Sequence, residues 1–260
     1  MNTKKILGLL GYPLGHSFSQ AFFTQKWQEL GLQNDYEYRL FEYKNIGDFF
    51  ENEVLNNKNL LGFNVTIPHK QNIINYLDDL NETARAVGAV NTVKREGDKW
   101  VGYNTDVIGF EQSAAISIFK EYGFRGALIL GAGGAAKAVS YVLQKYGIEH
   151  LFVLRGSETK KTIANSILYA DIDIDIIKKY PLIINATPCG TFPDVTKKPD
   201  FPYHLLPKKH FLYDLVYNPS LTAFMYAGAV QGCGVKNGEE MLHLQAEAAW
   251  QIWRKVAEIN

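Results

Sequence analysis

A glycine-rich turn at residues 131–136 (Gly-Ala-Gly-Gly-Ala-Ala) has the composition of a phosphate-binding loop. It follows an apolar run at 127–130, typical of a buried parallel strand, and precedes apolar residues at helical spacing over 137–146. A strand, a glycine turn and a helix in this order place backbone N–H groups and the positive end of a helix against a pyrophosphate. Gly131 would permit the tight turn, and Gly133 the close approach of the phosphate. The pattern predicts a dinucleotide site that includes Gly131, Ala132, Gly133, Gly134 and Ala135. The alternative is a glycine turn that binds no ligand.

The end of the next predicted strand distinguishes between the two nicotinamide cofactors. An NAD site places an acidic residue about 20 residues after the glycines, where it holds the ribose 2′-hydroxyl. Here the apolar run 151–154 is followed by Arg155, with Lys160 and Lys161 further on, and the nearest acid, Glu158, stands later in the turn. A guanidinium can pair with a 2′-phosphate, so we expect NADP. Arg155 could instead be an ordinary solvated arginine of a loop.

Polar residues interrupt the first half of the chain where predicted strands end. They form four groups: G-Y-P-L-G-H-S-F-S at 11–19, N-V-T-I-P-H-K at 64–70, G-A-V-N-T at 88–92 and G-Y-N-T-D at 102–106. Loops at strand ends carry function in open α/β sheets. Each residue also has a structural explanation: Ser19 and Asp106 are good helix N-caps, Lys70 could be a surface lysine, and Asn91 could serve a turn.

The four polar groups lie within a pattern of strands and helices that is predicted to alternate along the whole chain. Strands are predicted at 6–10, 36–43, 60–66, 89–94, 100–101, 127–130, 151–154, 182–186 and 211–215, and helices at 19–31, 46–55, 71–77, 82–87, 106–122, 137–146 and 239–256. Repeated βα units imply an α/β protein of two domains with mainly parallel sheets. We expect one domain at 1–104, completed by the C-terminal helix 239–260, and a Rossmann-like domain at 105–238. A cleft between them would bring a cofactor and a small substrate together.

Composition narrows the class of protein. A length of 260 residues with 47% hydrophobic residues suits two domains with sizeable cores. Lys and Arg balance Asp and Glu at 27 each, which gives no reason to expect nucleic acid or a membrane surface as a partner. Cys189, Cys233 and the scattered histidines show no metal-binding spacing, so no metal is expected. The apolar start is too short for a signal peptide, and no stretch reaches the roughly 20 residues of a membrane span. We therefore expect a soluble protein of the cytoplasm.

Taken together, the glycine turn and the four polar groups resemble the shikimate dehydrogenase family. The C-terminal half adds N-A-T-P at 185–188, D-L-V-Y-N-P at 214–219 with Thr222, and N-G at 237–238 followed by Met241-Leu242 and Gln245-Ala246. The resemblance runs through the whole chain, in order and at the expected intervals. It is much more specific than the glycine pattern alone.

The resemblance implies an NADPH-dependent reduction of 3-dehydroshikimate to shikimate, a step toward chorismate and the aromatic amino acids. Lys70 and Asp106 match the paired catalytic residues of the family. The residues that match the substrate site are Ser17 and Ser19 at the carboxylate, and Asn64, Thr66, Asn91, Tyr217 and Gln245 around the ring and its hydroxyls. Arg155, Thr187 and Gly238 join the glycine turn as expected NADP-binding residues. A monomer or a homodimer is expected.

The chain also departs from the family pattern. Gln20 and Phe23-Thr24 replace the usual proline and His-Asn, and Leu154-Arg155-Gly156 replaces the usual N-R-T, with Thr159 near the position of a second arginine. These changes leave open a quinate/shikimate dehydrogenase with relaxed use of NAD and NADP. A catalytically idle NADP-binding sensor is an alternative of another class, although such a protein would need neither Lys70 nor Asp106.

Overall fold

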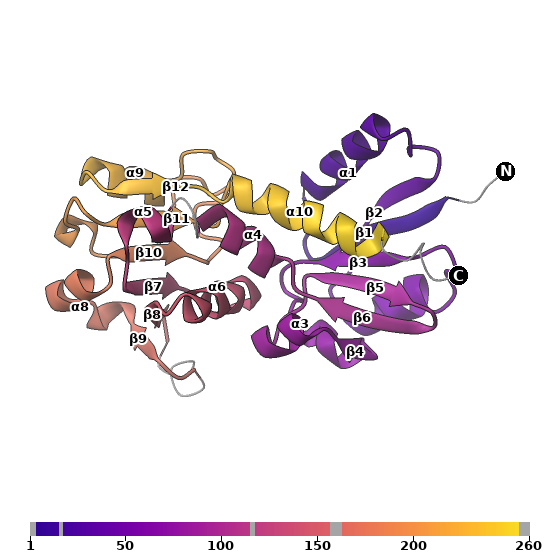
Figure 1. The fold of residues 1–260 in the computed structure, drawn as a ribbon, viewed down its shortest axis with the longest axis horizontal. Helices are drawn as coiled ribbons and strands as arrows, with labels where there is room; N and C mark the ends of the chain where they lie inside the picture. The colour runs from indigo at the N-terminus through magenta and orange to yellow at the C-terminus, as the bar shows by residue number, and fades with distance from the viewer. Residues whose placement is uncertain (1–3, 16–17, 115–117, 157–162, 255–260) are drawn as a thin grey trace. The chain divides into compact units, whose positions relative to one another are not determined.

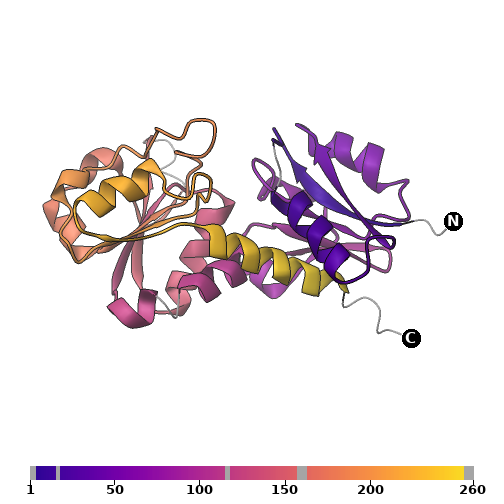
Figure 2. The same cartoon turned by 90° about the horizontal axis from the view of Figure 1, so that it is seen from above.

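The chain forms two compact units in a computed structural model, which describes residues 4–15, 18–114, 118–156 and 163–254. Unit 1 comprises Met1–Thr105 and Ala246–Asn260, and unit 2 comprises Asp106–Gln245. Both are α/β in composition, as Figures 1 and 2 show for each unit. The domain boundaries expected from the sequence were 104/105 and 238/239. The division of the chain into the two units falls at 105/106 and 245/246.

Unit 1 is built on a mixed six-stranded sheet in the order β2-β1-β3-β5-β6-β4. Its strands are β1 Lys5–Gly11, β2 Tyr36–Glu42, β3 Gly62–Val65, β4 Asp79–Leu80, β5 Thr92–Glu96 and β6 Lys99–Tyr103. Its helical segments are α1 Phe18–Glu29, α2 Ile46–Phe49, the π-helix Phe50–Val54, the 3₁₀ helix Asn72–Tyr76 and α3 Glu82–Val87. β5 runs antiparallel to β3 and β6, and the other paired strands run parallel. The polar groups at 11–19, 64–70 and 102–106 follow β1, β3 and β6, and the group at 88–92 leads into the antiparallel β5, so all four lie at one edge of the sheet.

The two faces of this sheet carry separate apolar clusters, because successive side chains of a strand point to opposite faces. On one face Ile6 and Leu10 pack with Phe49 and Phe63, beside the π-helix. On the other face Leu7 and Leu9 belong to a cluster rich in aromatic rings, which α1 and α10 (Glu239–Arg254) help to form. The members of this second cluster include Phe23, Trp27, Tyr38, Trp250 and Trp253.

Unit 2 contains a fully parallel six-stranded sheet in the order β12-β11-β10-β7-β8-β9. Its strands are β7 Gly126–Leu130, β8 Glu149–Leu154, β9 Ser166–Leu168, β10 Leu182–Asn185, β11 Phe211–Asp214 and β12 Gly234–Lys236. Its helical segments are α4 Asp106–Ala114, α5 Lys120–Tyr122, α6 Gly134–Lys145, the 3₁₀ turns Tyr169–Asp171 and Tyr203–Leu205, α8 Ile174–Lys179 and α9 Ala223–Val230. This is the doubly wound order, which reverses between β7 and β10, and ligands bind at such a reversal.

Helices cover both faces of the parallel sheet, as the alternation along β11 shows. Leu212 faces α9, where a Cβ on Gly228 would lie 2.5 Å from a Leu212 methyl. Tyr213 faces α4, where its hydroxyl lies 2.8 Å from Ser113 Oγ. The apolar run of the sequence is therefore a strand that is buried on both sides, as expected for a parallel sheet.

Some predicted elements differ in extent from the observed ones. The helix expected at 106–122 consists of α4 and the short α5, and residues 115–117 lie outside the described part of the chain. The strand expected at 89–94 begins only at Thr92. Within the ranges that the structure describes, no helix combines the length and the apolar character that a membrane crossing requires.

Candidate active site

Buried polar residues of unit 1 form one hydrogen-bonded network at the ends of β3 and β5. The Asn64 amide nitrogen donates to Asn91 O at 3.2 Å and to Thr92 Oγ1 at 3.0 Å. Asn91 Nδ2 donates to Thr105 Oγ1 at 2.9 Å, and Thr105 N donates back to Asn91 Oδ1 at 2.6 Å. All four residues are at most 5% exposed. Because buried amides with satisfied partners have fixed orientations, the network holds Asn64 and Asn91 rigidly.

The same network extends to α1 through Tyr38, which sequence reasoning did not single out. The Tyr38 hydroxyl donates to Asn64 Oδ1 at 2.8 Å and is hydrogen-bonded to Ser19. Burial raises the pKa of Tyr38 above its ordinary value, and the bond from Ser19 acts in the opposite direction. Ser19, Asn64 and Asn91, expected in one site, therefore lie on one continuous network. Ser17 lies outside the described residues.

Thr66 and Lys70 lie in the loop that leaves β3. The Thr66 amide donates to Leu10 O at 2.9 Å, and the amide of His69 donates to Thr66 O at 2.9 Å. Lys70 O accepts from Val90 N at 2.7 Å, so the Lys70 backbone is attached to the segment that leads into Asn91. The Lys70 side chain is half-buried, which suits an ammonium that must meet a ligand. Unit 1 thus brings Lys70 and Asn91 onto adjoining segments.

Asp106 and Gln245 lie on two helices that pack together within unit 2. Asp106 is the first residue of α4 and is 5% exposed. One turn later, a Cβ on Gly109 would lie 2.5 Å from Met241 O and 3.0 Å from Gln245 Cβ, so this glycine lets α4 approach α10 closely. Gln245 is half-buried and donates to Leu242 O at 3.0 Å. The two expected site residues therefore lie about one helical turn apart along the α4–α10 contact.

Tyr217, the remaining expected substrate residue, follows β11 at the same edge of unit 2 as the glycine turn. Its side chain is half-buried, and burial raises the pKa of its phenol above the ordinary value. Its hydroxyl therefore stays protonated near neutral pH and can donate a hydrogen bond.

The glycine turn adopts the conformation that a phosphate-binding loop needs. Gly131 has a φ of 100°, which favours glycine, and a Cβ there would lie 2.9 Å from Thr187 Cγ2. Gly133 is extended, with φ −74° and ψ −175°, and a Cβ there would meet nothing within 4 Å. The twelve-residue helix α6 begins at Gly134, so its first N–H groups point toward this open space. The turn can accept the pyrophosphate of a dinucleotide.

Thr187 is positioned by buried polar residues at the ends of β10 and β11. Its hydroxyl donates to Asn185 Oδ1 at 2.6 Å, and its amide donates to the same oxygen at 3.1 Å. Asn185 Nδ2 donates to Asp214 Oδ1 at 2.8 Å, and Thr222 Oγ1 donates to Asp214 Oδ2 at 2.6 Å. Burial raises the pKa of Asp214 to about 6, although the bonds from Thr222, Val216 N and Asn185 oppose that shift. Gly131 and Thr187, predicted from separate motifs, are in contact at the sheet reversal.

Arg155 and Gly238 complete the expected cofactor residues. Arg155 is exposed directly after β8, so its guanidinium can reach a ligand outside the strand end. Gly238 N donates to Val216 O at 3.2 Å, and a Cβ on Gly238 would overlap Leu215 O. Thr159, Lys160 and Lys161 lie outside the described residues. An open Gly133, a helix N-terminus and an exposed guanidinium together fit a dinucleotide that carries a 2′-phosphate.

Two helix-cap interpretations were wrong. Ser19 was expected to cap the helix at 19–31, but α1 begins at Phe18, so Ser19 lies inside its first turn and bonds Tyr38. Asp106 is likewise the first residue of α4 rather than the residue before it. The other residues that sequence reasoning missed are Thr92, Thr105, Asn185 and Asp214. Each of them stands in one of the motifs quoted from the sequence, and Asn185 and Asp214 are polar side chains at the ends of apolar strands, where they must find partners.

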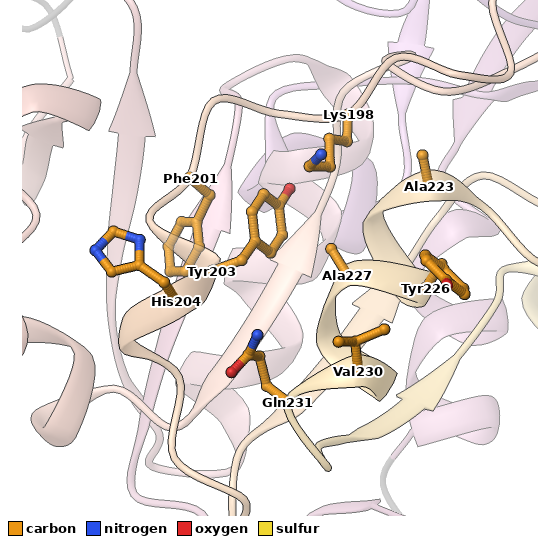
Figure 3. Close-up of a pocket in the computed structure, with 9 residues that line it drawn as sticks. All are labelled: Lys198, Phe201, Tyr203, His204, Ala223, Tyr226, Ala227, Val230 and Gln231. Carbon is orange, nitrogen blue, oxygen red and sulfur yellow. The ribbon is translucent and has the colours of Figure 1, made fainter.

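A surface pocket of about 400 Å³ lies elsewhere in unit 2, between the Tyr203–Leu205 turn and α9. Figure 3 shows Tyr203, Ala227 and Val230 around it, with Lys198 near the Tyr203 ring. The Lys198 ammonium lies 5.5 Å from the centroid of that ring. The lining residues are not among the expected site residues, so this pocket is separate from the candidate active site.

Comparison with known proteins agrees with the motifs. Residues 9–93 match the shikimate dehydrogenase substrate binding domain. A shikimate dehydrogenase (NADP(+)) of Methanococcus maripaludis is 38% identical, over 96% of this chain and 91% of the relative. A crystal structure of a shikimate dehydrogenase in complex with NADP+ superposes with a TM-score of 0.83 at 31% identity, over 98% of this chain and 92% of that one. The enzyme of Thermus thermophilus, in complex with NADP(H) and shikimate, gives 0.79 at 28% identity, over 96% and 93%. The chain therefore belongs to the shikimate dehydrogenase family.

Proposed function

We propose that this chain is an NADP-dependent shikimate dehydrogenase, which interconverts shikimate and 3-dehydroshikimate on the way to chorismate and the aromatic amino acids. The observation that carries the proposal is that this member of the family contains buried polar residues that suit the substrate and a glycine turn that suits the cofactor. Unit 1 holds a rigid network of buried polar residues beside Lys70, and unit 2 holds a glycine turn with an open phosphate position. The amide and hydroxyl side chains of this network suit a small polyhydroxylated acid as the substrate. A site lined with such groups rejects ligands that leave them unpaired.

The reduction needs a proton donor at the carbonyl oxygen. NADPH, when bound, supplies the hydride that reduces the ketone carbon. Lys70, as an ammonium, gives a proton to the oxygen that becomes the new hydroxyl. Asp106 orients the amine and accepts a hydrogen bond from the same hydroxyl. General acid catalysis of this kind contributes about 10²- to 10⁴-fold, and the positioning of the reactants contributes the rest.

The other expected residues bind and orient in this proposal. Ser17 and Ser19 hold the substrate carboxylate, and Asn64, Thr66, Asn91, Tyr217 and Gln245 surround the ring and its hydroxyls. The turn from Gly131 to Ala135, with Thr187 and Gly238, holds the cofactor backbone, and Arg155 pairs with the 2′-phosphate. We also place the enzyme in the cytoplasm, as a monomer or a homodimer.

The proposal is tested by initial rates of shikimate and quinate oxidation, each with NADP and with NAD, followed at the nicotinamide absorbance. We expect turnover of shikimate with NADP. Comparable rates with NAD or quinate would instead identify a quinate/shikimate dehydrogenase of broad specificity. No turnover with any pair of substrate and cofactor would refute the enzymatic function and favour the alternative of an NADP-binding sensor.

Arg155→Ala is expected to raise the KM for NADP about tenfold or more, because a hydrogen bond to a charged group contributes about 1.5–3 kcal/mol. The KM for NAD should stay near its wild-type value, since NAD carries no 2′-phosphate. Steady-state kinetics with both cofactors check this selectivity. The control is Arg125→Ala, which removes another exposed arginine of unit 2. Arg125 directly precedes β7, at the end of the strand opposite to the glycine turn. Equal effects on both cofactors would contradict the role of Arg155.

A further inference from the structure

The buried phenol of Tyr38 connects two residues of the candidate substrate site. Tyr38 is 6% exposed on β2, and its ring stacks on Phe23 with centroids 4.8 Å apart. Its single proton goes to Asn64 Oδ1, because an amide oxygen can only accept. The hydrogen bond between Tyr38 and Ser19 must therefore be donated by the serine hydroxyl. Packing holds the phenol in place, and the phenol sets the direction of both bonds.

The orientation of the Asn64 amide is also fixed from its other side. Asn91 O is a backbone carbonyl and can only accept, so the Asn64 atom that faces it at 3.2 Å is the nitrogen. The second amide proton goes to Thr92 Oγ1 at 3.0 Å. Both N–H groups of Asn64 are thus used within the protein, and Tyr38 occupies one lone pair of Oδ1. What Asn64 can offer to a ligand is the other lone pair of that oxygen.

We infer that Tyr38 is a positioning residue, which presents the Asn64 amide oxygen to the substrate as a hydrogen-bond acceptor. This inference rests on the proposed function, in which Asn64 binds the substrate. The matching ligand group is a ring hydroxyl that donates its proton to Asn64. A ligand with an ether or carbonyl oxygen at that place would set two acceptors against each other and would bind poorly. Tyr38 acts through Asn64.

Tyr38→Phe keeps the ring and its packing and removes both hydrogen bonds. The Asn64 amide then loses the partner that holds its oxygen, and Ser19 loses its acceptor. We expect the KM for shikimate to rise about 3- to 10-fold, because a net hydrogen bond contributes about 0.5–1.5 kcal/mol. The turnover number should change less than KM, as for a loss of uniform binding. The KM for NADP should stay at the wild-type value, a selectivity that a general loss of structure would not give.

Tyr36→Phe is the matched control, since it removes a hydroxyl two residues earlier on the same strand from a ring that packs on Trp27 and Trp250. It should leave both KM values unchanged. The rise in thermal midpoint on adding shikimate, measured beside that on adding NADP, should shrink selectively in Tyr38→Phe.

The outcomes separate the inference from the function on which it rests. An unchanged KM for shikimate in Tyr38→Phe, with an active wild type, would overturn the inference alone. So would equal rises in the KM values for shikimate and NADP with a lowered thermal midpoint, because they would indicate a merely structural tyrosine. A wild type that does not oxidise shikimate would refute the proposed function, and the inference with it.

Discussion

Lys70→Ala is expected to lower kcat for shikimate oxidation by about 10²- to 10⁴-fold while it changes the KM for shikimate far less. The reason is that the proton transfer by the Lys70 amine contributes most in the transition state, and a group of this kind affects kcat rather than ground-state binding. Steady-state kinetics with saturating NADP measure both constants. Any residual rate would then reflect the positioning of the reactants.

The fold should tolerate this substitution. The Lys70 backbone carbonyl, which accepts from Val90 N at 2.7 Å, is unchanged by loss of the side chain. The thermal midpoint should therefore stay near that of the wild type, so that a loss of rate can be assigned to chemistry. Lys58→Ala, which removes an exposed lysine of the same unit, is the control and should keep full activity. A Lys70→Ala enzyme with kcat close to the wild-type value would exclude Lys70 from the mechanism.

The sequence predicted those elements whose apolar pattern is long or strongly periodic. The strands at 6–10, 151–154 and 182–186 and the helix at 82–87 correspond closely to β1, β8, β10 and α3. β4, β9 and β12 were not predicted, because two or three residues are too few for an alternation to be visible. α9 was missed for another reason: its sequence is apolar on nearly every side, so it has no polar face to mark a helical period.

The candidate site was predictable as motifs but not as a network. Asn64, Asn91 and the glycine turn stand out because polar or flexible residues interrupt apolar runs. Tyr38 could not be distinguished from Tyr36 by type or alternation, because the two side chains point to the same face of the strand. What distinguishes it is a partner 26 positions away along the chain, on the parallel strand β3. Likewise, Asp214 was visible in a motif, but its link to Thr187 through Asn185 follows only from the order of β10 and β11 in the sheet.

Asp214→Asn is expected to remove a pH dependence of stability that the wild type has between about pH 4 and pH 6. The pKa of Asp214 is about 6 in the folded protein, against an ordinary value of 3.8. Between these values the folded state keeps the proton and the unfolded state has lost it, so the free energy of unfolding falls as the pH rises. The difference between the two pKa values corresponds to a loss of about 3 kcal/mol. Above about pH 6 the carboxylate is charged in both states, and this contribution stays constant.

The asparagine resembles the protonated form of Asp214. Its oxygen can still accept from Asn185 Nδ2 and Val216 N, and its amide can donate to Thr222 Oγ1, where the carboxylate accepts from the threonine hydroxyl in the wild type. The substitution thus changes these hydrogen bonds by an amount that does not depend on pH. Urea unfolding at several pH values from 4 to 8, for the wild type and the variant, gives the two curves to subtract.

The subtraction isolates Asp214, because every other titrating group is common to both proteins. The wild type should lose stability relative to Asp214→Asn as the pH rises from about 4 to 6, and the difference should then level off. Asp200→Asn, which removes an exposed carboxylate of the same unit, is the control and should give a flat difference. A flat difference for Asp214→Asn as well would contradict a raised pKa. The bonds from Thr222, Val216 N and Asn185 would then fully compensate the burial of the charge.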